Sequence, residues 1–449
     1  MKTRSMACLL VCLGCSEGTS SSNGDAGRIG RYDASVAPSS DGKGDAGSSG
    51  QAADGEAGSD GQVIPPPPVP CESTPGSDAD KDGFAAGVDC NDCDPNVNPA
   101  AFDIAGNQID DDCSGAADDE PTSCDAALSL ASEDAIDAAR AIGLCRDQRG
   151  SGWGLVSAQW VFPNGKATTS PVEVLCEKGL LVPHPLGHGL VESFGIHNVP
   201  TQGKRMVVLS SGLAEPGERL LGLDLRPAEG QSPDAVGHCV RSTPPPGFPK
   251  VTQGCSGNTG GNPSSVIFDP IALELKIKVP SNAKGLTFDS YFISSEFPWA
   301  VCKDWNDHFV TLLYSGHASV PSDHNISFDA KGGVISVNSA LVEVCSPVTL
   351  DGRTFPCKRG ETALEGTGLL MPGSGTNGQT YKIGGGTGWL TTRSPVVAGE
   401  TVTIRFAIWD DGDDGGDSSV LIDRFEWILP DPKPTAPPPP EEPVTVPVI

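Results

Sequence analysis

The sequence predicts a mainly β protein, in which a β-sandwich-like C-terminal region follows a disordered tether and a small, disulfide-rich calcium-loop segment. The clearest strand pattern lies at 271–279, where five aliphatic residues alternate with Ala, Glu, Lys and Lys, so that one face is buried and the other is wet. Similar alternation recurs at 402–408 and at 421–427. Because many short strands follow one another without intervening helices, a β-sandwich is the expected architecture.

The chain is strongly acidic, which limits its partners. It has 58 Asp plus Glu against 30 Lys plus Arg in 449 residues, a formal net charge of -28. This charge opposes binding to nucleic acid and to anionic membranes. Divalent cations and an unknown neutral surface ligand, a polysaccharide or a protein, remain the expected partners.

The N-terminus has the layout of an export signal. Lys2 and Arg4 precede a short apolar run and then Gly14-Cys15-Ser16, so residues 1–15 resemble a bacterial lipoprotein signal peptide with Cys15 as the lipid acceptor. Cys12 stands where such signals usually have leucine, which leaves simple secretion or a misplaced start codon as alternatives. No later stretch is long and apolar enough to span a bilayer, so membrane contact is expected only through the lipid, at the outer membrane or cell surface.

Two segments lack the composition of a folded core. Residues 16–70 consist largely of Gly, Ser, Asp and Ala and end near four consecutive prolines, which predicts a flexible tether with a stiff end. Residues 431–449 form a Pro-rich tail without a sorting helix, so attachment is expected at the other end. Between them lie a metal-binding segment, 71–124, and a β-rich domain, 125–430.

The metal-binding segment opens with the spacing of a calcium loop. Carboxylates stand at loop positions one, three, five and twelve, with glycine at six. The candidate ligands are Asp78, Asp80, Asp82, Phe84 and Asp89. Because four like charges repel within the empty loop, metal binding should order this segment.

A second loop repeats the pattern in part. Asp110, Asp112 and Ser114 occupy positions one, three and five, with glycine at six, but position twelve is Pro121, directly after three acidic residues. The second loop is therefore expected to be incomplete or differently closed.

The cysteine count predicts disulfides. Fifteen cysteines become twelve when the three in the signal are set aside, an even number typical of an exported protein. Cys90 and Cys93 form a Cys-x-x-Cys, but no second such pair or nearby histidine completes a zinc site. The disulfide candidates are Cys90, Cys113, Cys124 and Cys145, with a connectivity that the sequence does not define.

One helix and one hairpin turn are expected ahead of the main strands. The helix begins with an N-cap at Ser132, has apolar spacing at Ile136, Ala139 and Ile142, and ends at Gly143. Asn164-Gly165 is a typical two-residue hairpin turn.

The stretch 78–120 resembles a known motif. Asp89-Cys-Asn-Asp-Cys-Asp-Pro95 and Ile109-Asp-Asp-Asp-Cys113 are similar to the MopE-type metal-binding motif of secreted bacterial proteins, and the stretch is also similar to type 3 thrombospondin repeats. The MopE resemblance implies copper, yet the stretch has no His, Met or Trp, and its oxygen ligands favour calcium. Cys90 and Cys113 would ligate copper if reduced, whereas in an oxidising compartment they are expected to pair with each other.

The back half resembles the choice-of-anchor L domain over roughly 139–429. The resemblance implies an extracellular β-rich domain with varied surface attachments and no established catalysis. It is carried by Phe194-Gly195, Gly203–Gly212, Ser294-Ser-Glu-Phe-Pro298, Asn306-Asp-His-Phe309, Gly388–Thr392, Pro395–Glu400, Ile404–Asp410 and Asp417–Asp423.

Oxygen side chains at the ends of the expected strands form a further candidate site. Drawn from different loops, they could converge on a second calcium, or they could be acidic turns on a soluble sandwich. These residues are Glu296, Asn306, Asp307, Asp410, Asp411 and Asp417.

Catalytic sites are weakly indicated. His184 and His188 have the spacing of a helical zinc motif, but Pro185 and two nearby glycines oppose a helix, so loop histidines are preferred. The leading hypothesis is a non-enzymatic, calcium-binding cell-surface lipoprotein for adhesion or display. The alternatives are a secreted hydrolase that uses acidic loops around Asp307 or Asp417, and a copper-binding surface protein.

Overall fold

The computed structural model describes residues 71–121, 123–150, 152–168, 187–212, 214, 241–250, 266–303, 306–375, 378–412, 416–430 and 439–448. The expected signal and tether at 1–70, including Cys15, lie outside these residues, as does His184. The described residues all belong to one compact unit, Val69–Ile449.

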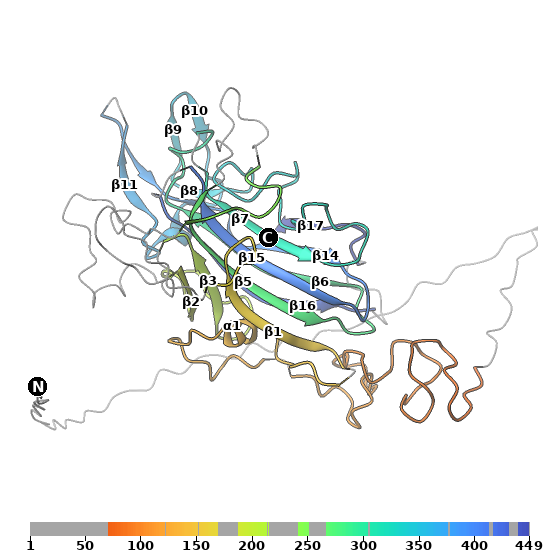
Figure 1. The fold of residues 1–449 in the computed structure, drawn as a ribbon. Helices are drawn as coiled ribbons and strands as arrows, with labels where there is room; N and C mark the ends of the chain where they lie inside the picture. Colours follow the sequence, from red (N-terminus) through yellow and green to blue (C-terminus); the bar gives the residue numbers. More distant parts are fainter. Residues whose placement is uncertain are drawn as a thin grey trace, which may run out of the picture. The chain divides into compact units, whose positions relative to one another are not determined.

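Two antiparallel sheets make up the β-rich domain (Figure 1). The five-stranded sheet has the order β1 (Gly154–Val161), β5 (Ile267–Lys278), β15 (Thr401–Asp410) and β7 (His308–Tyr314), with β4 (Arg241–Ser242) beside β5. The eight-stranded sheet has the order β17 (Val444–Pro447), β14 (Leu390–Pro395), β6 (Gly285–Ser294), β16 (Ser418–Ile428), β3 (Met206–Ser210) and β2 (His188–Val191), with β13 (Gly385–Gly386) and β8 (Val344–Cys345) off this path.

Two hairpins and a short helical turn extend from this framework. The elements are β9 (Val348–Leu350) with β10 (Arg353–Phe355), β11 (Met371–Ser374) with β12 (Thr380–Ile383), and the 3-10 helix η4 (Thr362–Leu364).

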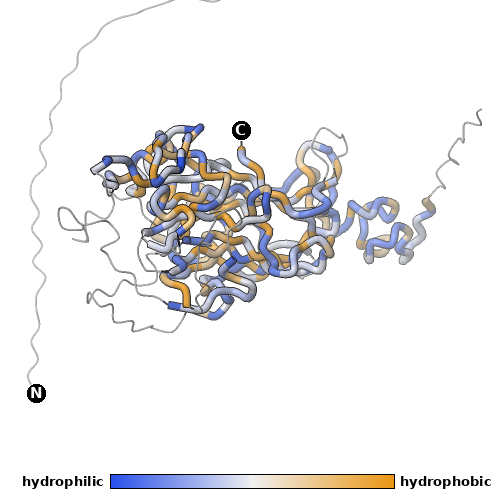
Figure 2. Tube along the Cα trace, turned by 90° about the horizontal axis from the view of Figure 1, so that it is seen from above, coloured by the Kyte–Doolittle hydropathy of each residue, from blue (hydrophilic) through white to orange (hydrophobic). Residues whose placement is uncertain are grey.

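The main core lies between the two sheets. Alternate residues of β15, including Ile404, Phe406 and Ile408, join the same buried cluster as Phe288 of β6. The rings of Phe288 and Phe406 meet edge to face, with centroids 4.9 Å apart. Hydrophobic and hydrophilic residues alternate along the chain in this region (Figure 2). The mainly β, sandwich-like fold expected from the alternation is thus confirmed.

The outer face of β5 is less wet than its pattern predicts. Lys276 is exposed, but Ala272 is fully buried in a separate cluster with Trp409 and Val310, and Glu274 is paired with Arg405. A short alanine at the middle of the strand leaves room for neighbouring segments to cover this face. The expectation of one wet face was therefore only partly right.

The expected helix forms, but its start differs. Helix α1 spans Ala135–Ala141, and its N-cap is Asp134, whose carboxylate accepts from the backbone N–H of Ile136 (2.9 Å). The hydroxyl of Ser132 bonds instead to Asp137 (2.7 Å). Ser132 and Asp134 both have side chains that can cap a helix, and Asp134, which lies closer to the first turn, is the N-cap. Gly143, with φ +106°, follows the helix as expected.

The tail contributes a strand to the sheet. Residues 444–447, placed by the sequence analysis in a Pro-rich tail, form β17, which pairs with β14 from Leu390 to Arg393. Prolines around a short strand are compatible with an edge position, where one row of N–H groups has no partner strand.

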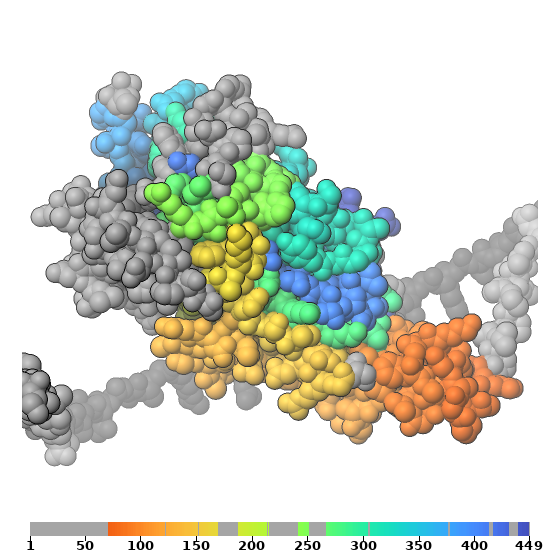
Figure 3. Space-filling view, viewed as in Figure 1, coloured from red at the N-terminus to blue at the C-terminus, as the bar shows by residue number. Residues whose placement is uncertain are grey.

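The metal-binding segment is described from residue 71 onward, has no helix or named strand, and lies beside the sandwich (Figure 3). It docks on the turn between β5 and β6. Asn282 accepts from the Phe102 N–H and donates to the Phe102 carbonyl, both at 2.9 Å, and Ser281 donates to Asn98 (2.7 Å). We call this end of the sandwich, where the metal-binding segment docks, the stalk end.

Disulfide bonding, expected from the cysteine count, is confirmed. Within the described residues the pairs are Cys71–Cys93, Cys90–Cys113, Cys124–Cys145 and Cys345–Cys357. Three of the four lie within residues 71–145, where few apolar residues are available to build a core.

Candidate metal centre

The first loop is shaped by carboxylates that accept from its own backbone. Asp78 accepts from the N–H groups of Lys81 (2.7 Å) and Gly83 (3.2 Å), and Asp82 accepts from the N–H of Phe84 (2.8 Å). Lys81 and Gly83 have φ values of +68° and +100°, which turn the chain around the carboxylates. Asp80 accepts from the Asp82 N–H (3.2 Å). These bonds hold the acidic side chains on the inside of the loop.

Three carboxylates of this loop lie close together. Asp78, Asp80 and Asp82 each place one oxygen within 4.8 Å of the others, whereas Asp89 is not part of this group. The second oxygens of Asp80, Asp82 and Asp89 are buried and have no hydrogen-bond partner among the described residues. Asp89 is itself only 7% exposed. A buried carboxylate oxygen without a donor is costly, so this arrangement is suited to a cation bound by oxygen ligands.

The electrostatics agree with this geometry. Burial raises the pKa of Asp80, Asp82 and Asp89 above the usual aspartate value, and repulsion from neighbouring carboxylates raises each of them further. The loop therefore resists holding all its negative charges unless a positive charge enters. A bound cation would reverse the shift, since it favours the ionised carboxylates.

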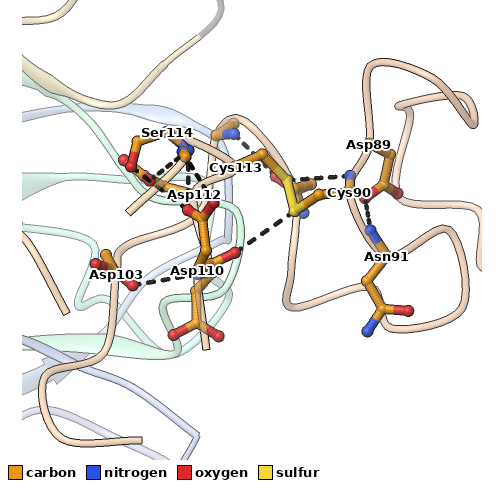
Figure 4. The surroundings of a disulfide bond; sticks show 12 residues. Asp89, Cys90, Asn91, Asp103, Asp110, Asp112, Cys113 and Ser114 are labelled. Carbon is orange, nitrogen blue, oxygen red and sulfur yellow. Dashed lines mark hydrogen bonds between the residues drawn. A yellow bond between two sulfur atoms is a disulfide. The ribbon is translucent and has the colours of Figure 1, made fainter. Parts of the chain in front are cut away.

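A disulfide ties the end of the first loop to the second (Figure 4). Cys90, directly after Asp89, is bonded to Cys113, and the Asn91 N–H donates to Asp89 (2.8 Å). Because both sulfur atoms are in the disulfide, neither is available as a thiolate ligand. The copper hypothesis thus loses the soft ligands on which it depended.

The second loop is closed by an arginine. Asp112 accepts from Arg146 Nη1 (2.8 Å), which also donates to Glu120 (3.0 Å), while Asp110 accepts from the N–H groups of Ser114 (2.9 Å) and Gly115 (2.9 Å). Within the described residues, Asp110, Asp112 and Ser114 do not belong to a group of metal-ligating side chains as tight as that of the first loop. The positive charge near position twelve of this loop is therefore the guanidinium of Arg146.

The strand-end residues gather at the end of the sandwich opposite the stalk end. Asp410 ends β15 and Asp411 follows it, Asp307 precedes β7, and Glu296 follows β6. The Asp307 N–H donates to Glu296 Oε2 (3.3 Å), and the Ser418 hydroxyl donates to Asp307 Oδ2 (2.5 Å). We call the following residues the distal cluster: Asp269, Glu296, Asn306, Asp307, Asp410, Asp411 and Asp417.

Burial perturbs the distal cluster strongly. It raises the pKa of Asp410 well above the usual value, and repulsion from Asp307, Asp269 and Asp417 adds to the effect. Burial alone raises the pKa of Asp411 to about 7. No three of these carboxylates bring their oxygens within 4.8 Å of one another, among the residues described, so this cluster is more open than the first loop.

Asp269 was missed by the sequence analysis. It lies on β5 at a shift in the pairing register with β15, and its φ is +45°. Because the alternation breaks at this point, no local pattern marked Asp269 as a buried residue.

His188, expected in a loop, lies in a strand instead. His188 begins β2 and stacks on Trp160, with ring centroids 3.8 Å apart. No helix in the described part of the chain has the length and hydrophobicity of a membrane span.

Comparison with known proteins finds a similarity to one family over part of the chain. Residues 264–425 match the family model of the Choice-of-anchor L domain. This match confirms the resemblance over most of both sheets and indicates an extracellular or surface-associated protein, whereas the motifs before residue 264 and the MopE-type segment lie outside it. Searches of curated proteins and of solved structures found no match.

Proposed function

We propose that this chain is a non-enzymatic, calcium-binding cell-surface protein that displays its β-sandwich for adhesion. In this proposal, calcium in the first loop stiffens the segment between the tether and the sandwich. The observation that supports it most directly is the first loop itself, where Asp80, Asp82 and Asp89 each brace the backbone with one oxygen and leave the other buried without a donor.

Calcium fits the residues better than softer or smaller metals. Ca²⁺ takes six to eight oxygen ligands in flexible geometry, whereas Mg²⁺ demands a near-ideal octahedron. Four carboxylates, with the Phe84 carbonyl at position seven, supply such ligands. The ligand set would be Asp78, Asp80, Asp82, Phe84 and Asp89.

Calcium titration of the full chain tests the first loop. Replacing Asp89 by asparagine removes the negative charge at position twelve, so we expect the calcium affinity of this loop to fall by roughly tenfold or more in isothermal titration calorimetry. The matched control is Glu72→Gln, an exposed acidic residue of the same segment, which should leave the affinity unchanged. Equal affinity of the Asp89→Asn and control proteins would refute calcium binding at this loop.

Lipidation at Cys15 is the proposed route of attachment. Replacing Cys15 by serine removes the proposed lipid acceptor, so we expect the protein to move from the membrane fraction to the soluble fraction of the expressing bacteria. Cell fractionation with an antibody against the sandwich measures this shift. Unchanged membrane association would contradict lipid anchoring while leaving the calcium proposal intact.

A further inference from the structure

The distal cluster forms a polar layer inside the end of the sandwich core. Along β15, the inward-facing residues Ile404, Phe406 and Ile408 belong to the main core, and Asp410 occupies the next inward position. Asp307 has the same relation to Phe309 of β7. Because side chains alternate between faces, both carboxylates point between the sheets. Asp269 lies at a register shift of β5 next to Asp410, where its φ is +45°.

The opposite sheet contributes to the same layer. On β16, Ser418 precedes the inward residues Val420 and Ile422, and its hydroxyl reaches across the sheets to Asp307. Glu296 lies in the turn that follows β6 and is itself fully buried. The layer therefore joins both sheets at the point where their hydrophobic packing ends.

Two of these carboxylates are without partners in a way that is unusual for this protein. Asp410 and Asp411 are 0% and 1% exposed, and none of their four oxygens has a hydrogen-bond partner among the described residues. Two other buried carboxylates have donors on both oxygens: Arg424 pairs with Asp289, and three backbone N–H groups donate to Asp423. Burying a carboxylate without donors is costly, so a positively charged ligand is expected here.

Glycines next to the cluster leave room for its acidic side chains. A Cβ atom on Gly212 would collide with the carboxylate of Asp417, and one on Gly416 would lie 2.8 Å from Glu296 Cγ. Only glycine lets the side chains of Asp417 and Glu296 lie this close to the backbone. These two glycines therefore leave room for acidic side chains at this end of the core.

We propose that the distal cluster binds a hard divalent cation of the calcium class, which clamps the two sheets together at the end far from the stalk. Asp410 is its principal ligand, with Asp307 from the neighbouring strand. Oxygens on opposite sides of Ca²⁺ lie about 4.6–5.2 Å apart, so a cluster without three carboxylates inside 4.8 Å still fits an ion that also binds carbonyls and water. β15 spans ten residues, which places this site ~30 Å from the stalk end.

Thermal unfolding and bound-ion counts of the full chain test the proposal. The background is a variant with Asp78→Asn and Asp82→Asn, which removes two first-loop carboxylates and leaves the distal cluster native. We expect this variant to retain a bound calcium in equilibrium dialysis. Its Tm should rise by roughly 5–10 °C when free calcium is about a hundred times the dissociation constant.

Adding Asp410→Asn to that background should change Tm in opposite directions in EDTA and in calcium. The neutral amide removes a buried charge, so Tm should increase in EDTA, while the calcium-dependent rise and the bound ion are lost. Asp351→Asn, at an exposed hairpin residue, is the matched control and should behave like the background.

Two results would overturn the distal site. One is a background variant that binds no calcium and shows the same Tm in calcium and EDTA; this result does not depend on whether Asp410→Asn folds. The other is an Asp410→Asn protein that keeps both the ion and the calcium-dependent rise. Neither outcome bears on the first loop, which the Asp89→Asn titration tests separately.

Discussion

Replacing Phe406 by alanine is expected to destabilise the sandwich by about 3–5 kcal/mol, because a fully buried aromatic side chain is lost from between the sheets. Phe406 lies on β15, the strand between β5 and β7, and its ring contacts Phe288 of the other sheet. The cavity left by the ring is flanked by strands on both sides, and these strands have little freedom to move into it. Urea unfolding followed by tryptophan fluorescence measures the change.

Phe355→Ala is the matched control for this substitution. Phe355 is a partly exposed residue of the β9–β10 hairpin and packs against Phe297. Its removal should cost less than half as much. If Phe406→Ala stays within about 1 kcal/mol of the native protein, the two sheets do not share the core described above.

Replacing Arg146 by methionine is expected to destabilise the docking of the metal-binding segment by about 2–3 kcal/mol, since two buried carboxylates lose their cation. The side chains of Asp112 and Glu120 are only 4% and 8% exposed. The guanidinium also lies over the ring of Trp153, with 5.1 Å to the centroid. Because Arg146 itself is 30% exposed, the cost should be below that of a fully buried pair.

Hydrogen exchange of residues 103–121 measures this loss of docking. Exchange should increase there, with little change in β5 and β15, and adding Asp112→Asn and Glu120→Gln to Arg146→Met should restore part of the protection. The control is Arg149→Met. Arg149 is exposed, and with Arg146 it lines a cavity of about 410 Å³. Equal exchange in the Arg146 and Arg149 variants would show that the arginine does not hold the second loop.

Local patterns allowed much of this fold to be predicted. The alternation at 271–279 identified β5, and the loop spacing selected Asp78, Asp80 and Asp82, whose carboxylates lie close together. Both patterns depend on residues close together in sequence. The alternation of β15 also places Asp410 on the inward face.

The remaining features depend on contacts that local patterns do not contain. The partner of Asp112 is Arg146, 34 residues further along the chain, so closure of the second loop by an arginine could not be read from the loop. The burial of Asp410 and Asp411 arises where two sheets meet. β17 joins the sheet by pairing with β14, a strand about fifty residues earlier, although its prolines alone suggest a tail.

Hydrogen exchange of the full chain in calcium and in EDTA tests the central claim most directly. The backbone N–H groups of Lys81, Gly83 and Phe84 donate to loop carboxylates, so calcium binding should slow their exchange by roughly tenfold or more in the native protein, and much less in the Asp89→Asn variant. Identical exchange of these three amides in saturating calcium and in EDTA would contradict a calcium-stiffened segment.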